Sequence, residues 1–224
     1  MKTLVFDSGP VISLTMNNLL WILDPLKHRF QGDFLITPKV KEELVEKPMK
    51  TKKYKLEAIQ VRQQIEKQVI TEIKEKKELT EMTERMLFYA NNTFQAWGSY
   101  IKIVQEAEIQ SLALAKTIGA QAVVVDERNV RMMVEDAETL GTILKKKLHT
   151  SIKTDKSNLR KFQQLTEGIR LIRSLELVMI SYQLGLFDMY NTEKKELIEA
   201  LLWGVKLNGC SVSEKEIKNI LAIV

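Results

Sequence analysis

The sequence predicts an α/β fold, a three-layer sandwich around a central, mostly parallel sheet. Short apolar runs of the kind that form buried parallel strands recur along the chain, and each is followed by a helical pattern. The 224 residues include only 9 Gly and 4 Pro, and 45% of them are hydrophobic. Regular secondary structure is therefore expected over most of the chain.

Four apolar runs are the predicted strands of this sheet. They lie at 4–6, 33–36, 121–125 and 169–172. After the first run, Pro10 stands where a helix is expected to begin, because proline loses no needed backbone donor there. This helix is predicted to span residues 11–23. Strands that alternate with helices indicate parallel pairing through right-handed crossovers.

Two long helical stretches interrupt the alternation, at about 50–104 and 132–167. Apolar stripes separated by charges in the first predict two amphipathic helices that form a hairpin. The second contains the basic sequence LKKKLHTSIKTDKSNLRK, the first candidate for a phosphate-contacting surface, although a solvated helix face explains it equally well. Residues from about 175–224 are predicted to form C-terminal helices. We expect one domain over 1–224 that carries both insertions.

Composition and charge narrow the class of protein. The net charge of +5 tolerates a polyanionic partner without requiring one, because Lys and Glu are interspersed. Cys210 is the single cysteine, which excludes an intrachain disulfide and a cysteine-based zinc site. No uninterrupted apolar stretch reaches the roughly 18 residues of a membrane span. We expect a cytoplasmic protein without a membrane partner.

Two of the predicted strands end on a carboxylate. Asp7 follows the first run and Asp126 follows the third, and each precedes a helix start. An Asp in this place is often only a helix cap, so capping is the alternative to a functional role. Neighbouring parallel strands would bring the two carboxylates close together, where like charges raise each other's pKa unless a cation offsets them. Such a pair favours a divalent metal, and oxygen ligands suit Mg²⁺ or Mn²⁺.

Acidic residues on two predicted helices could complete this site. Glu108 shares a helix face with apolar residues at i+4 and i+7, so it should point toward the sheet, whereas Glu106 points elsewhere. Glu43 lies three residues after Val40 on the expected buried side, with Glu42 as the fallback.

These same residues carry a resemblance to a known family. The segments VFDSGPVISL, TPKVKEEL and EAEIQSLALAKTIGAQAVVVDERNVR resemble the PIN-domain family, metal-dependent ribonucleases found widely in archaea and bacteria. The third segment, which ends at Arg131, is similar to a toxin-like branch of the family, and so is the chain from Gly185 onward. Segment 168–174 resembles the fourth strand of that branch, which ends on Ser or Thr.

The resemblance implies a site and an activity. Asp7, Glu43, Glu108 and Asp126 would surround Mg²⁺ or Mn²⁺, as metal ligands and catalytic residues, with Glu127 and Ser174 as auxiliaries. Two departures from the family pattern bear on catalysis. Ala107 replaces the glycine that usually precedes the third acid, and the two insertions exceed the usual connections.

The predicted function is therefore hydrolysis of RNA phosphodiester bonds by a metal-dependent ribonuclease. The alternative is a weak or inactive PIN-like scaffold that binds RNA or a protein through its helical insertions. An antitoxin, another protein partner or a homo-oligomer are the partners that the resemblance and the exposed amphipathic helices leave open. A phosphotransferase of the haloacid dehalogenase type is disfavoured, because it needs a second Asp where this chain has Gly9.

Overall fold

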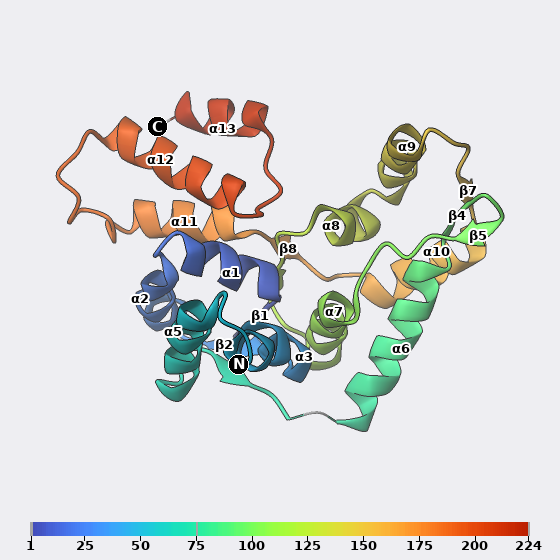
Figure 1. The fold of residues 1–224 in the computed structure, drawn as a ribbon, viewed down its shortest axis with the longest axis horizontal. Helices are drawn as coiled ribbons and strands as arrows, with labels where there is room; N and C mark the ends of the chain where they lie inside the picture. Colours follow the sequence, from blue (N-terminus) through green and yellow to red (C-terminus); the bar gives the residue numbers. More distant parts are fainter. Residues whose placement is uncertain (1, 75, 224) are drawn as a thin grey trace.

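A computed structural model describes residues 2–74 and 76–223. Position 75, inside the first predicted insertion, and position 224, at the end of the predicted C-terminal helices, lie outside the described residues. The centre is a five-stranded parallel sheet with the order β3-β2-β1-β6-β8 (Figure 1). Its strands are β1 (Thr3–Phe6), β2 (Asp33–Ile36), β3 (Thr71–Glu72), β6 (Ala122–Val124) and β8 (Leu171–Ile172). The predicted α/β fold is confirmed.

Alternation along the strands creates two hydrophobic cores, one on each face of the sheet. Leu4 and Phe6 of β1 face one core, and Val5 faces the other, as the two-residue period of a strand requires. The strand is buried on both of its faces, as expected of a parallel sheet covered by helices. This arrangement gives three layers.

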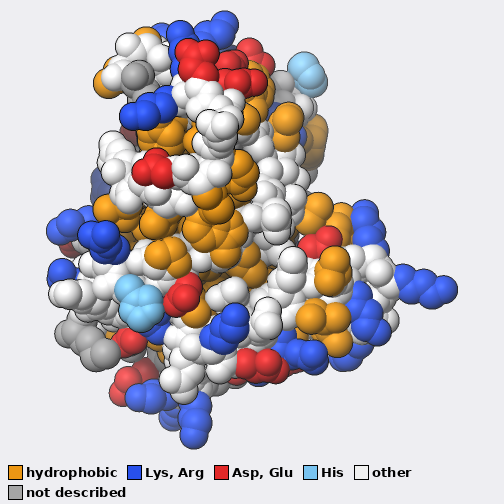
Figure 2. Space-filling view, turned by 90° about the vertical axis from the view of Figure 1, so that its left-hand side faces the viewer, with side chains coloured by type: hydrophobic (Ala, Val, Ile, Leu, Met, Phe, Trp, Pro, Cys, Tyr) orange, Lys and Arg blue, Asp and Glu red, His pale blue; other side chains and the backbone are white. Residues whose placement is uncertain are grey.

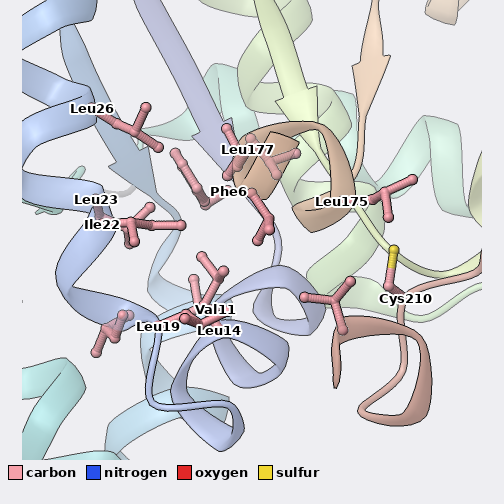
Figure 3. Close-up of a cluster of buried hydrophobic side chains, with 14 of the residues drawn as sticks. Phe6, Val11, Leu14, Leu19, Ile22, Leu23, Leu26, Leu175, Leu177 and Cys210 are labelled. Atoms are coloured by element: carbon pink, nitrogen blue, oxygen red, sulfur yellow. The ribbon is translucent and has the colours of Figure 1, made fainter. Parts of the chain in front are cut away.

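The first core joins the beginning of the chain to its end. Side chains from β1, α1 (Ser8–Met16), α2 (Leu23–Phe30) and α11 (Ser174–Gln183) converge there, and Cys210 lies at its edge near Leu175 (Figure 3). Helices α12 (Lys194–Leu207) and α13 (Glu214–Leu221) complete it through buried residues such as Leu202 and Ile217. The C-terminal helices therefore cover the same sheet face as α1.

The second core is covered by the middle of the chain. Its helices are α6 (Lys77–Asn91), α7 (Glu106–Ile118), α8 (Arg128–Glu135), α9 (Ala137–Leu148) and α10 (Lys156–Thr166). A small antiparallel sheet, which the sequence did not predict, lies at this end of the molecule (Figure 1). It consists of β4 (Phe94–Ala96), β5 (Ser99–Tyr100) and β7 (Lys153–Thr154).

The structure corrects the prediction of a helical hairpin within 50–104. Both helices exist, as α5 (Lys55–Glu66) and α6, but they pack on different parts of the molecule. Helix α5 packs on α1, whereas α6 packs on α7 and α10 (Figure 1). The reason is β3, which lies between them in sequence and pairs with β2, so the chain crosses the sheet edge from one helix to the other.

The helix predicted over 11–23 is also corrected. Helix α1 already begins at Ser8 and ends at Met16, and Asn18 has a left-handed backbone with φ 57°. Asparagine tolerates this conformation, which stops the helix. The chain then continues through a short 3₁₀ turn, η1 (Leu20–Ile22), into α2.

A helical segment of mixed geometry follows β2. It runs through α3 (Pro38–Lys41), a π-helical turn η2 (Glu42–Glu46) and α4 (Lys47–Met49). Thr37 caps its start by accepting a hydrogen bond from the Val40 N–H at 3.3 Å. π-Helical turns are rare in proteins, and those that occur often lie at functional sites. This one carries Glu43.

No described helix, in either range of the chain, is long and apolar enough to cross a membrane.

Candidate functional site

Asp7 occupies the cap position of α1 without acting as a cap. Its backbone is extended, with φ −77° and ψ 166°, and its N–H donates to the Val124 carbonyl at 2.9 Å, which continues the β1–β6 pairing. The side chain makes no capping hydrogen bond. Only 2% of Asp7 is exposed, and its Oδ1 atom has no hydrogen-bond partner among the described residues. Capping therefore does not account for the buried Oδ1 atom of Asp7.

Burial and charge act together on the Asp7 carboxyl. Burial raises the pKa of Asp7 to about 7, the N–H groups of Ser8 and Gly9 act in the opposite direction, and the charges of Glu43 and Asp126 raise it further. A carboxyl group whose pKa is raised to near 7 by burial and neighbouring charges is a marker of functional sites.

Asp126 lies two residues after the end of β6 and is also buried, with 2% exposure. Ser174, the first residue of α11, holds both of its oxygens. The Ser174 N–H donates to Oδ1 at 2.8 Å, and the Ser174 hydroxyl donates to Oδ2 at 2.7 Å. Burial raises the pKa of Asp126, and the Ser174 hydrogen bonds lower it. Asp126 therefore depends on Ser174 for its orientation.

The two aspartates lie on either side of Gly9. A Cβ atom built on Gly9 would lie 3.6 Å from the Asp126 Cβ and 3.7 Å from the Asp7 Oδ2. The parallel pairing of Phe6 with Val124 aligns the two strand ends. The carboxyl edge of the sheet thus holds both acids, where ligands bind in open α/β sheets.

The helical acids separate as their spacing predicted. Glu42 lies 3.4 Å from Lys47 and 3.8 Å from Lys39, so it belongs to surface ion pairs. The charge of Glu43, in contrast, raises the pKa of both Asp7 and Glu108. Glu43 is therefore the acid of this pair that lies in the electrostatic environment of the strand ends.

The second helical pair behaves in the same way. Glu106 lies 3.4 Å from Lys39 on the surface. Burial raises the pKa of Glu108 to about 7, and the charges of Asp7, Glu127 and Glu43 add to the effect. The Glu108 carboxylate also accepts a hydrogen bond from the Gln105 N–H at 2.7 Å. It therefore closes the first turn of α7 while it faces the other acids.

The predicted auxiliaries have separate roles. Glu127 caps α8, because its Oε1 accepts from the Asn129 N–H at 3.2 Å. Ser174 holds Asp126, as described above. Arg131 donates to the carbonyl and hydroxyl oxygens of Ser211 at 3.4 and 3.3 Å, which ties α8 to the C-terminal segment.

The four acids form one electrostatic group, but their side chains are not arranged as a coordination shell. Across residues 2–74 and 76–223, no three Asp, Glu, His or Cys side chains are placed to hold one metal ion. Two of the acids accept local hydrogen bonds, Glu108 from the Gln105 N–H and Asp126 from Ser174. The donor chemistry nevertheless fits Mg²⁺ or Mn²⁺, because all four groups offer oxygen and the buried Asp7 Oδ1 has no partner within the described part of the chain.

Sequence reasoning missed the contribution of the segment after α12. The Ser211 N–H donates to the Asp126 carbonyl at 3.2 Å, and the Cys210 thiol lies in hydrogen-bonding contact with the Asp126 carboxylate. Burial raises the pKa of Cys210 to about 12, and the charge of Asp126 adds to this shift, so the thiol stays protonated. Nothing in the local pattern around Cys210 marks this contact, which links residues far apart in sequence.

These features define an α/β protein with a buried acidic centre at the carboxyl edge of a parallel sheet. A family model described as a PIN domain matches residues 3–165, and the chain therefore belongs to the PIN-domain family. PIN domains are generally nucleases, which are hydrolases. The matched residues include the whole first insertion and nearly all of the second. Comparison with curated proteins and with solved structures gave no match.

Proposed function

We propose that this protein is a metal-dependent ribonuclease that hydrolyses RNA phosphodiester bonds. Asp7, Glu43, Glu108 and Asp126 are the proposed catalytic and metal-binding residues. The observation that carries the proposal is the Asp7 carboxyl, which is buried at a strand end with one oxygen atom without a partner among the described residues. Burial of such a group is costly unless a cation or donor compensates it.

The proposed chemistry assigns a role to each group of residues. Bound Mg²⁺ or Mn²⁺ would lower the pKa of a water molecule and stabilise negative charge on the scissile phosphate. Asp7 and Asp126 would hold the ion from the strand ends, while Glu43 and Glu108 would approach it from two helices. Ser174 would orient Asp126, and Glu127 would add negative charge near Glu108. No side-chain nucleophile is required.

RNA is the proposed substrate because the chain belongs to the PIN-domain family, and its net charge of +5 is compatible with a polyanion. That the protein binds an antitoxin or a second copy of itself stays a prediction.

Cleavage of a mixed set of structured and unstructured RNAs tests the proposal. Wild type is compared with Asp7→Asn and Asp126→Asn in Mg²⁺, Mn²⁺ or EDTA, and Asp24→Asn is the matched control because Asp24 is exposed. We expect metal-dependent cleavage by wild type and by the control, and none by either site variant once each is shown to be folded. Absence of cleavage by folded wild type in every metal would reject the ribonuclease.

An inactive PIN-like scaffold is the second candidate function. The arrangement of the acids favours it, because among the described residues no three Asp, Glu, His or Cys side chains are placed to hold one metal ion. If folded wild type binds RNA or a protein without cleaving RNA, and both Asp variants bind equally well, the scaffold replaces the enzyme.

A further inference from the structure

An apolar cleft opens beside the acidic group and shares Glu43 with it. The cleft has a volume of about 410 Å³. Its apolar wall comes from α1, η2 and α5 and includes Ile12, Met16, Leu44, Tyr54, Ala58 and Val61. Helix α1 begins directly after Asp7, and the charge of Glu43 acts on Asp7. Whatever fills the cleft therefore lies beside Glu43, one of the four acids.

Tyr54 is the aromatic residue of the cleft and has an unusual backbone. Its φ is 62° and its ψ is 15°, the left-handed region, which bulky residues rarely adopt. Tyr54 is 47% exposed, although it also lines the apolar cleft. Strained, exposed residues of this kind cluster at ligand sites. The fold thus holds an aromatic ring at the opening of the cleft.

Lysines flank Tyr54 in the sequence. The sequence KPMKTKKYK places Lys50, Lys52, Lys53 and Lys55 within five positions of Tyr54, and all four are exposed. The Lys53 ammonium lies 4.6 Å from the centre of the Tyr54 ring. On the side of the molecule where α2 and α5 lie, hydrophobic side chains cross the middle of the face and Lys and Arg side chains gather around its lower edge (Figure 2).

The charges divide the surface into two zones. The cleft itself carries the carboxylates of Glu43 and Glu57 and no lysine among its described lining residues, so a phosphate is repelled from it. Carboxylates accept hydrogen bonds from the exocyclic amino groups of bases. The flanking lysines attract phosphates. An unpaired base in an apolar, aromatic pocket with the backbone on a basic rim is how proteins bind single-stranded nucleic acid.

We propose that this cleft binds one unpaired nucleobase of an RNA strand, stacked at Tyr54, while the lysines of segment 50–55 contact the adjacent phosphates. The inference rests on the proposed function, and it adds a specificity site that selects single-stranded RNA beside the acidic group. The basic sequence in 144–161 is not part of it. That sequence lies in α9, β7 and α10, at the opposite end of the molecule from α5 (Figure 1).

Binding in EDTA tests the site without cleavage. The probe is a fluorescent single-stranded oligoribonucleotide, compared with a duplex of the same sequence. Tyr54→Asn removes the ring but suits the left-handed backbone, so folding is preserved. Tyr54→Phe retains the ring. We expect Tyr54→Asn to weaken single-strand binding about 10-fold and Tyr54→Phe to remain within about 2-fold of wild type.

The lysines are tested through salt dependence. The double variant Lys52→Gln/Lys53→Gln should reduce the slope of log affinity against log salt by about 1.4, because each contact to a single strand contributes about 0.7. Lys194→Gln/Lys195→Gln is the matched control, from two exposed lysines at the start of α12. The inference is overturned if the control variant reduces the salt slope as much as the double lysine variant does. It is also overturned if the duplex binds as tightly as the single strand, or if Tyr54→Asn has no effect on single-strand binding.

Two outcomes separate this inference from the proposed function. If wild type cleaves RNA and Tyr54→Asn leaves single-strand binding unchanged, the ribonuclease stands and the base site fails. If no RNA is cleaved but the ring and the lysines still control single-strand binding, the base site stands and the ribonuclease fails. Self-association in sedimentation that disappears in Tyr54→Asn, with RNA binding unchanged, would assign the cleft to a protein contact and overturn the inference.

Discussion

Ser174 binds the Asp126 carboxylate at both oxygens, through its backbone N–H at 2.8 Å and its hydroxyl at 2.7 Å. Asp126 follows the end of β6 and Ser174 begins α11, so their contact joins the sheet to the C-terminal helices. The hydroxyl both orients the acid and lowers its pKa against the effect of burial. The acidic centre is therefore built jointly by the two parts of the chain.

Replacing Ser174 with Ala is expected to destabilise the fold and weaken Mn²⁺ binding. Loss of a buried hydrogen bond to a charged group costs about 1–3 kcal/mol, and the pKa of Asp126 should rise, so the loss of affinity should be larger at pH 6 than at pH 8. Thermal unfolding and calorimetric titration measure the two effects. Ser181→Ala is the matched control, because Ser181 is buried in the same helix and donates to the Leu177 carbonyl at 2.8 Å. Equal loss of Mn²⁺ affinity in both variants would contradict the assigned role.

The Asp7→Asn variant should be more stable than wild type at high pH in EDTA. The pKa of Asp7 rises from 3.8 in the unfolded chain to about 7 in the folded protein. Asp7 therefore contributes fully to the free energy of unfolding below about pH 4, where it is protonated in both states. This contribution is lost as the pH rises through about 7 and the folded protein must hold a buried charge. We expect an advantage on the order of 1–3 kcal/mol for the variant at pH 8 that fades toward pH 4.

Thermal unfolding across pH 4–8 gives this comparison, with Asp24→Asn as the exposed control. An Asp7→Asn advantage that does not change with pH would show that Asp7 is not held neutral by the fold.

Mn²⁺ binding should be coupled to proton release. Both Asp7 and Glu108 have a pKa of about 7, and a cation binds only their ionised forms. Affinity should therefore rise between pH 6 and pH 8, by up to about 10-fold per pH unit for each proton released. Calorimetry in buffers of different ionisation enthalpy counts the protons. Binding that releases no proton at pH 6.5 would exclude these two acids as ligands.

A chain that ends at residue 165, where the family match ends, is expected not to fold. Leu175, Val178 and Leu202 of the C-terminal helices are each at most 2% exposed and belong to the same core as Phe6. Their removal would expose that face of the sheet and take Ser174 away from Asp126. Circular dichroism and thermal melting of the truncated and full chains measure the effect. A sharp melting transition in the truncated chain would show that residues 3–165 fold alone, against the single domain predicted over the whole chain.

Much of the fold and the positions of the acids could be predicted from local patterns. The apolar runs at 33–36 and 121–125 became β2 and β6, and the run at 169–172 became β8. A serine followed three residues later by a glutamate is typical of a capping box. Ser213 and Glu216 form one at the start of α13, where the Glu216 N–H donates to the Ser213 hydroxyl at 3.1 Å. The local pattern does not predict strand β3, because Val69 and Ile73 continue the four-residue spacing of the preceding helix. Pairing with β2 makes this segment a strand.

Within the acidic group, the sequence by itself determined which acids end the strands and which face inward. Periodicity separates Glu43 from Glu42 and Glu108 from Glu106, because neighbouring residues of a helix point in different directions. Tertiary structure alone decided the partners of these acids. The contacts of Asp126 with Ser174 and Cys210, and the cleft at Tyr54 beside Glu43, join segments distant in sequence. Such contacts depend on how helices pack across the sheet, and a local pattern of apolar and polar residues specifies only which face is buried.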